Sequence, residues 1–287
     1  MRPLMKPRLS ALYPEALVTG ASSGLGRAFA EGLMAEGVRV WGTARDTARL
    51  AALTAAGPSR FRPLALDLAD GAGAEVVLRS AAREAGGAFD LVVQNAGYGA
   101  FGGFARSEFS LWQRQLEAML VTTARLSHLA LRLMRERSPE APAGGLVHVS
   151  SIAAEFPLPF MSGYNMAKAG LSALSESLIF ETRGTKVRVI DFRPGDYRTA
   201  FNQAMQSSPP PASLAAAGRA WPVLEAHLNA APPAAAAAAD LIRALRRRRR
   251  GVVRSGSFFQ ARLAPLLAGL APAALVRAAT ARYFGSP

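Results

Sequence analysis

The 287-residue chain contains no cysteine and only three histidines. Without cysteine it can form no disulfide bond, thiolate nucleophile or cysteine metal site. His128, His148 and His227 lie too far apart in the sequence to indicate a metal cluster, so no metal is expected. His148 stands in an apolar strand, residues 146–149, where a hydrogen-bonded core histidine is the favoured interpretation.

The sequence also has little that would direct it out of the cell or across a membrane. Residues 1–10 contain no apolar core of a secretory signal, so a cytoplasmic location is expected. An apolar segment at residues 263–276 is interrupted by Pro265 and Pro272. It is shorter than the roughly 20 residues that span a bilayer.

Half of the residues are hydrophobic, enough for one large core. Short apolar runs alternate with helical segments, which predicts an α/β protein with a doubly wound parallel sheet. The expected organisation is an N-terminal extension (1–13), a single domain (14–255) and an amphipathic C-terminal extension (256–287). Strands are expected near Ala16, Val38, Phe61, Phe89, Leu146, Val187 and Gly251.

A glycine-rich turn follows the first apolar strand. Gly20 permits a tight turn, Gly24 allows the backbone to approach a ligand, and Gly26 lets the next helix, expected over residues 27–36, close on the sheet. The helix N-terminus would then face a pyrophosphate. A plain glycine turn is the alternative, but the strand before it, the helix after it and a second strand at 38–43 favour a nucleotide site.

Tyr164 and Lys168 stand four residues apart, which places them on one face of a helix. An ammonium beside the phenol would lower the tyrosine pKa towards neutrality and make it an acid or base for carbonyl chemistry. The pair by itself also fits an ordinary amphipathic surface. Ser151, thirteen residues upstream, favours the catalytic interpretation.

The order of these features resembles the short-chain dehydrogenase/reductase family over roughly residues 14–255. The resemblance implies a Rossmann fold, NAD(P)-dependent oxidoreduction and three catalytic residues: Tyr164 as proton donor and acceptor, Lys168 tuning it and binding the nicotinamide ribose, and Ser151 orienting the carbonyl. Thr199 would hold the carboxamide. Tyr164 and Lys168 also belong to the implied cofactor site, together with Gly20, Ser22, Ser23, Gly24, Leu25, Gly26, Thr43, Arg45, Asp67, Leu68, Asn95, Ala96, Gly97, Pro194, Gly195 and Thr199.

The end of the second strand indicates which dinucleotide binds. A carboxylate there suits the ribose 2′-hydroxyl of NAD, whereas a guanidinium suits the 2′-phosphate of NADP. The strand ends in Thr43 and is followed by Arg45, so NADP is preferred over NAD, with Ser22, Thr43 and Arg45 around the phosphate. Alternatively, Arg45 is a solvated charge or pairs with Asp46.

Two positions depart from the family pattern. Met119 stands where many members carry the asparagine that holds a proton-relay water, and a thioether cannot replace an amide there. Thr122 or Thr123 could hold that water, the relay could be altered, or Met119 could be a core residue without a part in it. Gln94 replaces a second asparagine before Asn95.

Apolar residues near these motifs predict a hydrophobic ketone, aldehyde or secondary alcohol as substrate. A catalytically weak NADP(H)-binding protein on the same fold is the alternative function, because of Met119. A mobile flap is expected to begin in the proline-rich segment 207–213. The candidate pocket residues, of which about half could be core, are Tyr98, Phe101, Phe104, Phe156, Leu158, Met161, Tyr197, Phe201 and Trp221.

Positive charge is concentrated at the C-terminal end. Of the net charge of +14, residues 241–287 contribute ten arginines and no acid, so the preceding part carries only +4. Residues 246–250 are five consecutive arginines. No interleaved aromatics accompany this run, so a nucleic-acid partner is not expected, and a solvated helix end explains it.

Basic and aromatic residues in the tail allow peripheral contact with an anionic membrane. Packing over the substrate cleft or against a partner subunit is the favoured alternative. A homodimer through the two long helices, about residues 109–135 and 164–182, is a further expectation.

Overall fold

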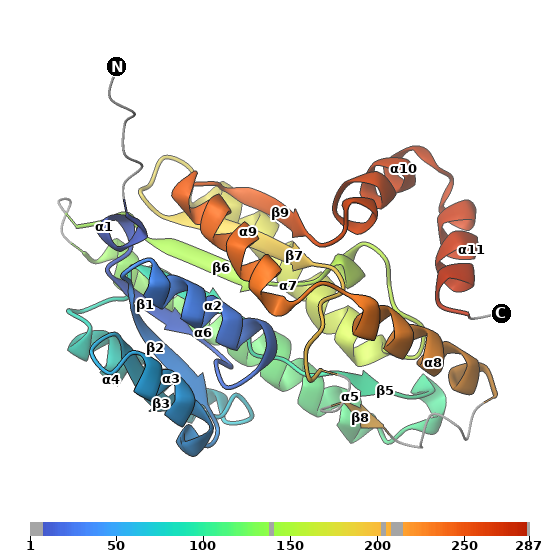
Figure 1. Ribbon diagram of the computed structural model, residues 1–287, viewed down its shortest axis with the longest axis horizontal. Helices are drawn as coiled ribbons and strands as arrows, with labels where there is room; N and C mark the ends of the chain where they lie inside the picture. Colours follow the sequence, from blue (N-terminus) through green and yellow to red (C-terminus); the bar gives the residue numbers. More distant parts are fainter. Residues whose placement is uncertain (1–7, 138–140, 202–204, 208–214, 286–287) are drawn as a thin grey trace.

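The computed structural model describes residues 8–137, 141–201, 205–207 and 215–285. Seven parallel strands form one sheet in the order β3-β2-β1-β4-β6-β7-β9 (Figure 1). This is the predicted doubly wound α/β fold, and all seven expected strands are present. They are β1 (Glu15–Val18), β2 (Arg39–Ala44), β3 (Phe61–Ala65), β4 (Leu91–Gln94), β6 (Gly145–Val149), β7 (Arg188–Pro194) and β9 (Gly251–Ser255).

Helices cover both faces of the sheet. In Figure 1, α2 (Gly24–Ala35) and α9 (Ala234–Arg246) cross in front of it, whereas α6 (Thr122–Arg135) and α7 (Ser162–Glu181) lie behind. The other helical segments are α1 (Leu9–Leu12), η1 (Thr47–Leu50), α3 (Ala51–Ala56), α4 (Gly71–Glu84), η2 (Phe104–Arg106), α5 (Phe109–Leu116), η3 (Glu117–Val121), η4 (Ile152–Ala154), α8 (Ala215–Ala230), η6 (Phe259–Leu263), α10 (Ala264–Leu270) and α11 (Ala273–Tyr283).

Strand β1 shows why both faces need covering. Ala16 and Val18 point into the core beneath α2 and α9, and Leu17 points into the core beneath α4, α6 and α7. All three are fully buried. A strand buried on both faces carries apolar residues throughout, which is why these strands appear as continuous apolar runs in the sequence.

The strands that follow β1 are added on one side of it, and those from β4 onwards are added on the other side. The chain adds β2 and β3 on one side of β1, then crosses to β4 and continues through β6, β7 and β9 on the other side. Ligands in such sheets bind beyond the carboxyl ends of the strands at this point of reversal.

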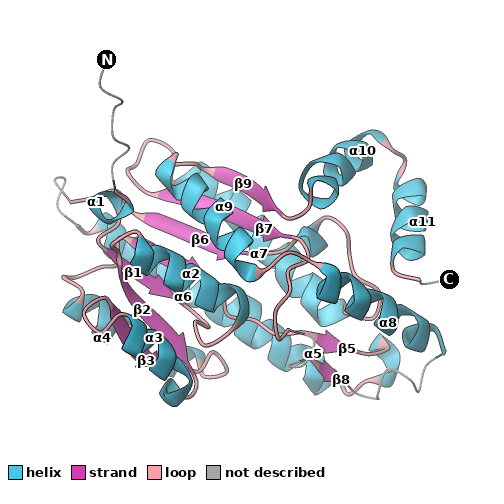
Figure 2. Cartoon of the chain, in the orientation of Figure 1, coloured by secondary structure: helices cyan, strands magenta, loops and turns pink. Residues whose placement is uncertain are grey.

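Two helices differ from their sequence-based description, and two short strands lie apart from the sheet. The helix expected over 27–36 begins at Gly24, and the long helix expected over 109–135 contains a π-helical turn, η3. Two short strands, β5 (Ala100–Phe101) and β8 (Gln206–Ser207), pair beside α5 and α8, away from the main sheet (Figure 2). Apart from residue 207, the predicted flap at 207–213 lies outside the described residues.

No helix in the described part of the chain combines the length and apolar character that a membrane span requires.

Candidate active site

A cleft of about 820 Å³ opens at the carboxyl ends of the strands. The glycine-rich turn, the ends of β2, β4, β6 and β7, the start of α7 and parts of α10 and α11 form its walls. With the exception of Gly26, every residue that the sequence assigned to catalysis or cofactor binding lines this cleft. The structure therefore gathers residues separated by up to 179 positions in the sequence, Gly20 to Thr199, in one site.

Gly26 supports the turn from behind. A Cβ at this position would clash with the Gly20 carbonyl and the Asn95 side-chain amide, so only glycine lets α2 approach so closely. Thr19 links the glycine-rich turn to the segment after β4, because its hydroxyl accepts hydrogen bonds from the N–H groups of Asn95 and Ala96, each at 2.9 Å. The N-terminus of α2 begins at the cleft wall, and its N-cap residue, Ser23, makes no side-chain capping bond.

At the end of β2, Thr43 and Arg45 both line the cleft, as does Ser22 on the glycine-rich turn. The buried Thr43 hydroxyl accepts the Gly20 N–H at 3.2 Å, so Thr43 also supports the glycine turn, and its role as a phosphate ligand stays a prediction. Asp46 accepts the Ala48 N–H at 2.9 Å and does not pair with Arg45. Arg45 is exposed at the cleft, and Arg49, which the sequence analysis missed, lines the cleft with it.

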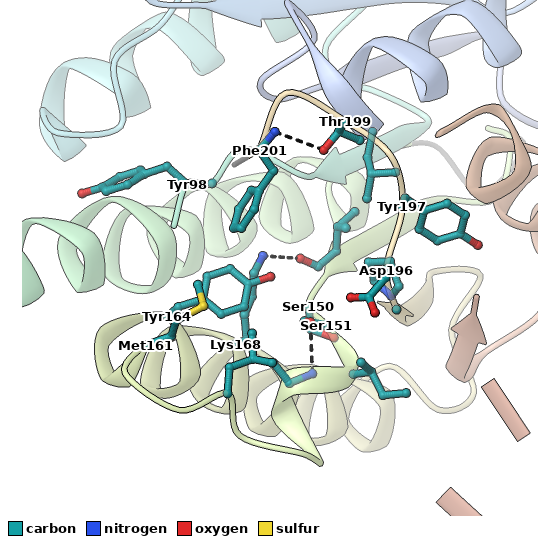
Figure 3. A pocket seen from close by; sticks show the side chains of 18 of the residues that line it. Tyr98, Ser150, Ser151, Met161, Tyr164, Lys168, Asp196, Tyr197, Thr199 and Phe201 are labelled. Carbon is teal, nitrogen blue, oxygen red and sulfur yellow. Dashed lines mark hydrogen bonds between the residues drawn. The ribbon is translucent and has the colours of Figure 1, made fainter. Parts of the chain in front are cut away.

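The predicted catalytic residues face the same part of the cleft (Figure 3). The Lys168 Nζ lies 5.6 Å from the centre of the Tyr164 ring and donates a hydrogen bond to the Val149 carbonyl at 2.7 Å. The Ser151 hydroxyl accepts the Ala153 N–H at 3.0 Å and also hydrogen bonds to Tyr164. One helix and the loop after β6 thus bring the three side chains together.

The expected lowering of the tyrosine pKa is not observed. Burial raises the pKa of Tyr164 above its ordinary value, the Ser151 hydrogen bond opposes this only in part, and the nearby Asp196 charge raises it further. Burial also lowers the pKa of Lys168 to about 8, which weakens its influence on the phenol, while Asp191 acts in the opposite direction. Tyr164 is therefore a protonated phenol at neutral pH.

A buried ionic network lies directly behind these residues. Asp191, on β7, is fully buried and accepts hydrogen bonds from Ser150, from Ser172 at 2.7 Å and from Arg193 Nε at 2.7 Å. Arg193 also pairs with Glu155 at 2.5 Å. The sequence analysis missed this network, although a charged residue in an apolar strand, Asp191 between Ile190 and Phe192, was a usable signal.

His148 is the hydrogen-bonded core histidine that the sequence predicted. It is fully buried, and its two ring nitrogens contact the hydroxyls of Ser127 at 2.8 Å and Ser175 at 2.7 Å. Burial lowers the pKa of His148 to about 4. The ring is therefore neutral at physiological pH and helps to fix α6 and α7 against the sheet.

Met119 lies inside the site, on the π-helical turn. It is buried, it lines the cleft, and its sulfur accepts the Tyr98 N–H at 3.5 Å. Neither threonine proposed as a substitute lines the cleft. Thr123 hydrogen bonds to the Ala118 carbonyl at 3.4 Å, and the buried Thr122 hydroxyl lies towards Gly71 on α4.

Most of the apolar residues that the sequence predicted for a pocket line one cleft. Phe101 and Trp221 instead pack against each other with ring centres 5.0 Å apart, and Phe104 stacks on Trp112 outside the cleft. The predicted residues that do line the cleft are Tyr98, Phe156, Leu158, Met161, Tyr197 and Phe201.

Comparison with known proteins gives consistent matches. A family model described as short chain dehydrogenase matches residues 14–209. An uncharacterized oxidoreductase of Myxococcus xanthus is 38% identical over 64% of this chain and 72% of its own length. Carbonyl reductase [NADPH] 2 of Sus scrofa is 29% identical over 68% of this chain and 76% of its own length. The crystal structure of a short-chain dehydrogenase from Streptomyces avermitilis superposes with a TM-score of 0.78 at 31% identity, covering 90% of this chain and 94% of that one.

Proposed function

The chain belongs to the short chain dehydrogenase family and is an oxidoreductase, and we propose that it transfers a hydride between NADP(H) and a hydrophobic ketone, aldehyde or secondary alcohol. One observation carries this proposal. Tyr164, Ser151 and Lys168 meet in a cleft whose one end is the glycine-rich turn with Arg45 and whose other end is apolar.

The residues at the turn fit a dinucleotide. The close approach of α2 at Gly26 and the helix N-terminus at the cleft wall match a pyrophosphate, and Asp67 lines the cleft where an adenine would lie. A bound nicotinamide would supply or accept the hydride. Lys168, which lies beside Gly97 and the Val149 carbonyl, would hold its ribose.

The raised pKa of Tyr164 suits carbonyl reduction. A phenol that keeps its proton at neutral pH can donate it to the oxygen of a carbonyl as that oxygen gains negative charge. Ser151, hydrogen bonded to the same phenol, would orient the carbonyl oxygen. In the opposite direction, the Tyr164 phenol would first have to lose its own proton, which requires a higher pH, and the resulting phenolate would accept the proton of the alcohol.

Replacement of the tyrosine tests this assignment. Tyr164→Phe removes the hydroxyl alone, so we expect a loss of turnover of at least about 100-fold with nearly unchanged cofactor affinity. The measurement is NADPH consumption with a panel of apolar ketones and aldehydes, alongside a cofactor titration. A variant that keeps more than about a tenth of the rate contradicts the role of Tyr164.

Arg45 and Arg49 support the preference for NADP. Both are exposed at the cleft wall, and among the described residues neither pairs with a carboxylate, so both are available to a 2′-phosphate. A charge-assisted hydrogen bond contributes about 1.5–3 kcal/mol, or roughly tenfold or more in affinity. Arg45→Ala should weaken NADPH binding by this factor and leave NADH binding unchanged.

The control for that titration is Arg62→Ala, which removes an exposed arginine on β3 outside the cleft. It should retain the wild-type preference. Equal affinities of the wild type for NADPH and NADH, or an Arg45→Ala protein that keeps the preference, would show that Arg45 does not select the cofactor.

Met119 favours a second candidate, a protein that binds NADP(H) with weak turnover. Its sulfur is held by the Tyr98 N–H, in the position where an amide would hold a relay water. Binding of NADPH without measurable consumption across the substrate panel would support this candidate. Turnover comparable with ordinary enzymes, about 1 s⁻¹ or faster, would exclude it.

We also propose a homodimer through the long helices. Phe109 on α5, Val121 on η3, and Met166 and Phe180 on α7 are large apolar side chains exposed on these helices. Burying them in a self-complementary interface would remove apolar surface from water. Light scattering on the purified protein measures the mass directly, and a monomer at micromolar concentration contradicts the proposal.

A further inference from the structure

The C-terminal arm, residues 258–283, exposes much of the apolar surface of the molecule. Eight of the fourteen large hydrophobic side chains exposed among the described residues belong to it. Leu266 and Leu270 are 63% and 80% exposed and lie outside the cleft. With Leu263 and Leu267 they recur at spacings of three and four residues, so they share one side of the helix formed by η6 and α10.

The arm is anchored at both ends and stands away from the sheet between them (Figure 1). Near its start, the Gln260 amide donates a hydrogen bond to Asp196 at 2.5 Å, next to the cleft. At its end, Tyr283 packs on His227 of α8 with ring centres 4.4 Å apart, and Phe284 is buried against Leu224. These contacts attach the arm at both of its ends, and the leucines between them are exposed.

The charges on the arm indicate what covers it. Arg262, Arg277 and Arg282 are exposed, and no carboxylate of the described residues pairs with them. The chain has no acidic residue after Asp240. Two copies meeting through their arms would bring like charges together, whereas an anionic lipid surface supplies both phosphate groups for the arginines and an apolar layer for the leucines.

The run of arginines at residues 246–250 is less available for such a contact. Arg246 pairs with Glu36 at 2.7 Å, and Arg250 donates to the Val187 carbonyl at 2.8 Å. This run precedes β9 and the arm follows it, so the two lie at opposite ends of that strand (Figure 1).

We propose that the arm docks the protein on an anionic membrane, with Leu266 and Leu270 inserted among the lipids and Arg262, Arg277 and Arg282 on the headgroups. Docking does not depend on catalysis. If the proposed function also holds, the arrangement explains the substrate class, because Leu267 and Leu275 of the arm line the cleft that contains Tyr164. A hydrophobic substrate could then enter from the bilayer.

Sedimentation with phospholipid vesicles tests docking without any substrate. The wild type should bind to phosphatidylcholine vesicles in which about a third of the lipid is phosphatidylserine, an anionic lipid. It should bind far less to vesicles of phosphatidylcholine alone. Binding should weaken as salt is raised, because charges at a surface are screened. Failure to bind the anionic vesicles overturns the proposal.

Two matched sets of variants locate the contact. Replacing Arg262, Arg277 and Arg282 with Gln should weaken binding to the anionic vesicles on the order of a hundredfold, given the contribution of each basic residue near such a surface. The control replaces the same number of arginines at the other end of β9, namely Arg247, Arg248 and Arg249. An equal loss in the control would mean that net charge alone drives binding, and would refute the assignment to the arm.

The apolar contact has its own pair of variants. Leu266→Ser with Leu270→Ser should weaken binding roughly tenfold or more, whereas Val76→Ser, on α4, should not. All these side chains are exposed, so unchanged thermal unfolding is expected and identifies folded variants. If the leucine pair leaves vesicle binding intact but turns a dimer into a monomer, a second copy covers the arm and the proposal fails.

Discussion

The buried carboxylate of Asp191 should control both the stability of the protein and the charge on Lys168. Asp191→Asn keeps the shape of the side chain and removes its charge. Arg193 then loses its fully buried carboxylate partner and keeps Glu155, which is partly exposed, and the more distant Glu176. The amide NH2 also replaces one of the two oxygens that accept hydrogen bonds from Ser150, Ser172 and Arg193. Removing one member of a buried ion pair costs about 3–5 kcal/mol.

Because Glu155 still pairs with Arg193, we expect the lower end of that range, about 3 kcal/mol. At roughly 2–4 °C per kcal/mol for a chain of this size, the melting temperature should fall by about 6–12 °C. Urea titration gives the free energy of unfolding directly. A loss below about 1 kcal/mol would show that the network does not stabilise the fold.

The same variant should change the pH dependence of turnover. Burial lowers the pKa of Lys168 to about 8, and the Asp191 charge opposes that lowering. Without the charge the pKa of Lys168 falls further, so the lysine loses its proton at a lower pH. If the protonated lysine is needed for the reaction, the alkaline limb of kcat/KM moves to lower pH.

Glu155→Gln is the matched control for this effect. It removes a carboxylate from the same network, where Glu155 contacts Arg193 and Arg254, but its charge does not act on the pKa of Lys168. It should lower stability and leave the alkaline limb in place. A pH profile that is the same in wild type and Asp191→Asn would refute the electrostatic role of Asp191.

Three further predictions concern the same site. The pKa of Lys168 is lower in the folded than in the unfolded state, so the unfolded chain binds more protons between about pH 8 and 10.5. As the pH rises through that window, the wild type should gain roughly 2–3 kcal/mol of stability relative to Lys168→Met, measured by urea titration. Gly26→Ala should cost about 1–3 kcal/mol of stability and abolish tight NADPH binding, because the new Cβ clashes with the Gly20 carbonyl; normal NADPH affinity would contradict this. If Met119 impairs proton delivery, Met119→Asn should raise kcat with little change in KM, and an unchanged or lower kcat would leave Met119 as a packing residue.

The fold was predictable because its signals are local. Strands β1 and β4 each contain three consecutive apolar residues, 16–18 and 91–93, as expected for strands buried on both faces, and the glycine spacing of 20, 24 and 26 is read directly from the sequence. The same holds for the pairing of Tyr164 with Lys168, because helix geometry alone places residues four apart on one face. His148 was predictable for a similar reason, since a polar ring in an apolar strand must find hydrogen-bond partners.

Properties that depend on distant contacts were not predictable. The pKa of Tyr164 was expected to fall because of a neighbour on its helix, but burial by residues from other segments, Phe201 among them, raises it instead. Thr43 stands at the expected place, but its support of the glycine turn through the Gly20 N–H, 23 residues away, could be seen only in the structure.

The sequence by itself determined the order of the strands along the chain, the glycine-rich turn and the candidate catalytic residues, because each depends on spacing within one or two elements. Tertiary structure alone decided the environment of those residues: Asp191 behind Lys168, and the C-terminal arm at the mouth of the cleft, held by Gln260 and Asp196, 64 residues apart. Burial and charge are sums over all neighbours in space, and most of those neighbours are distant in sequence.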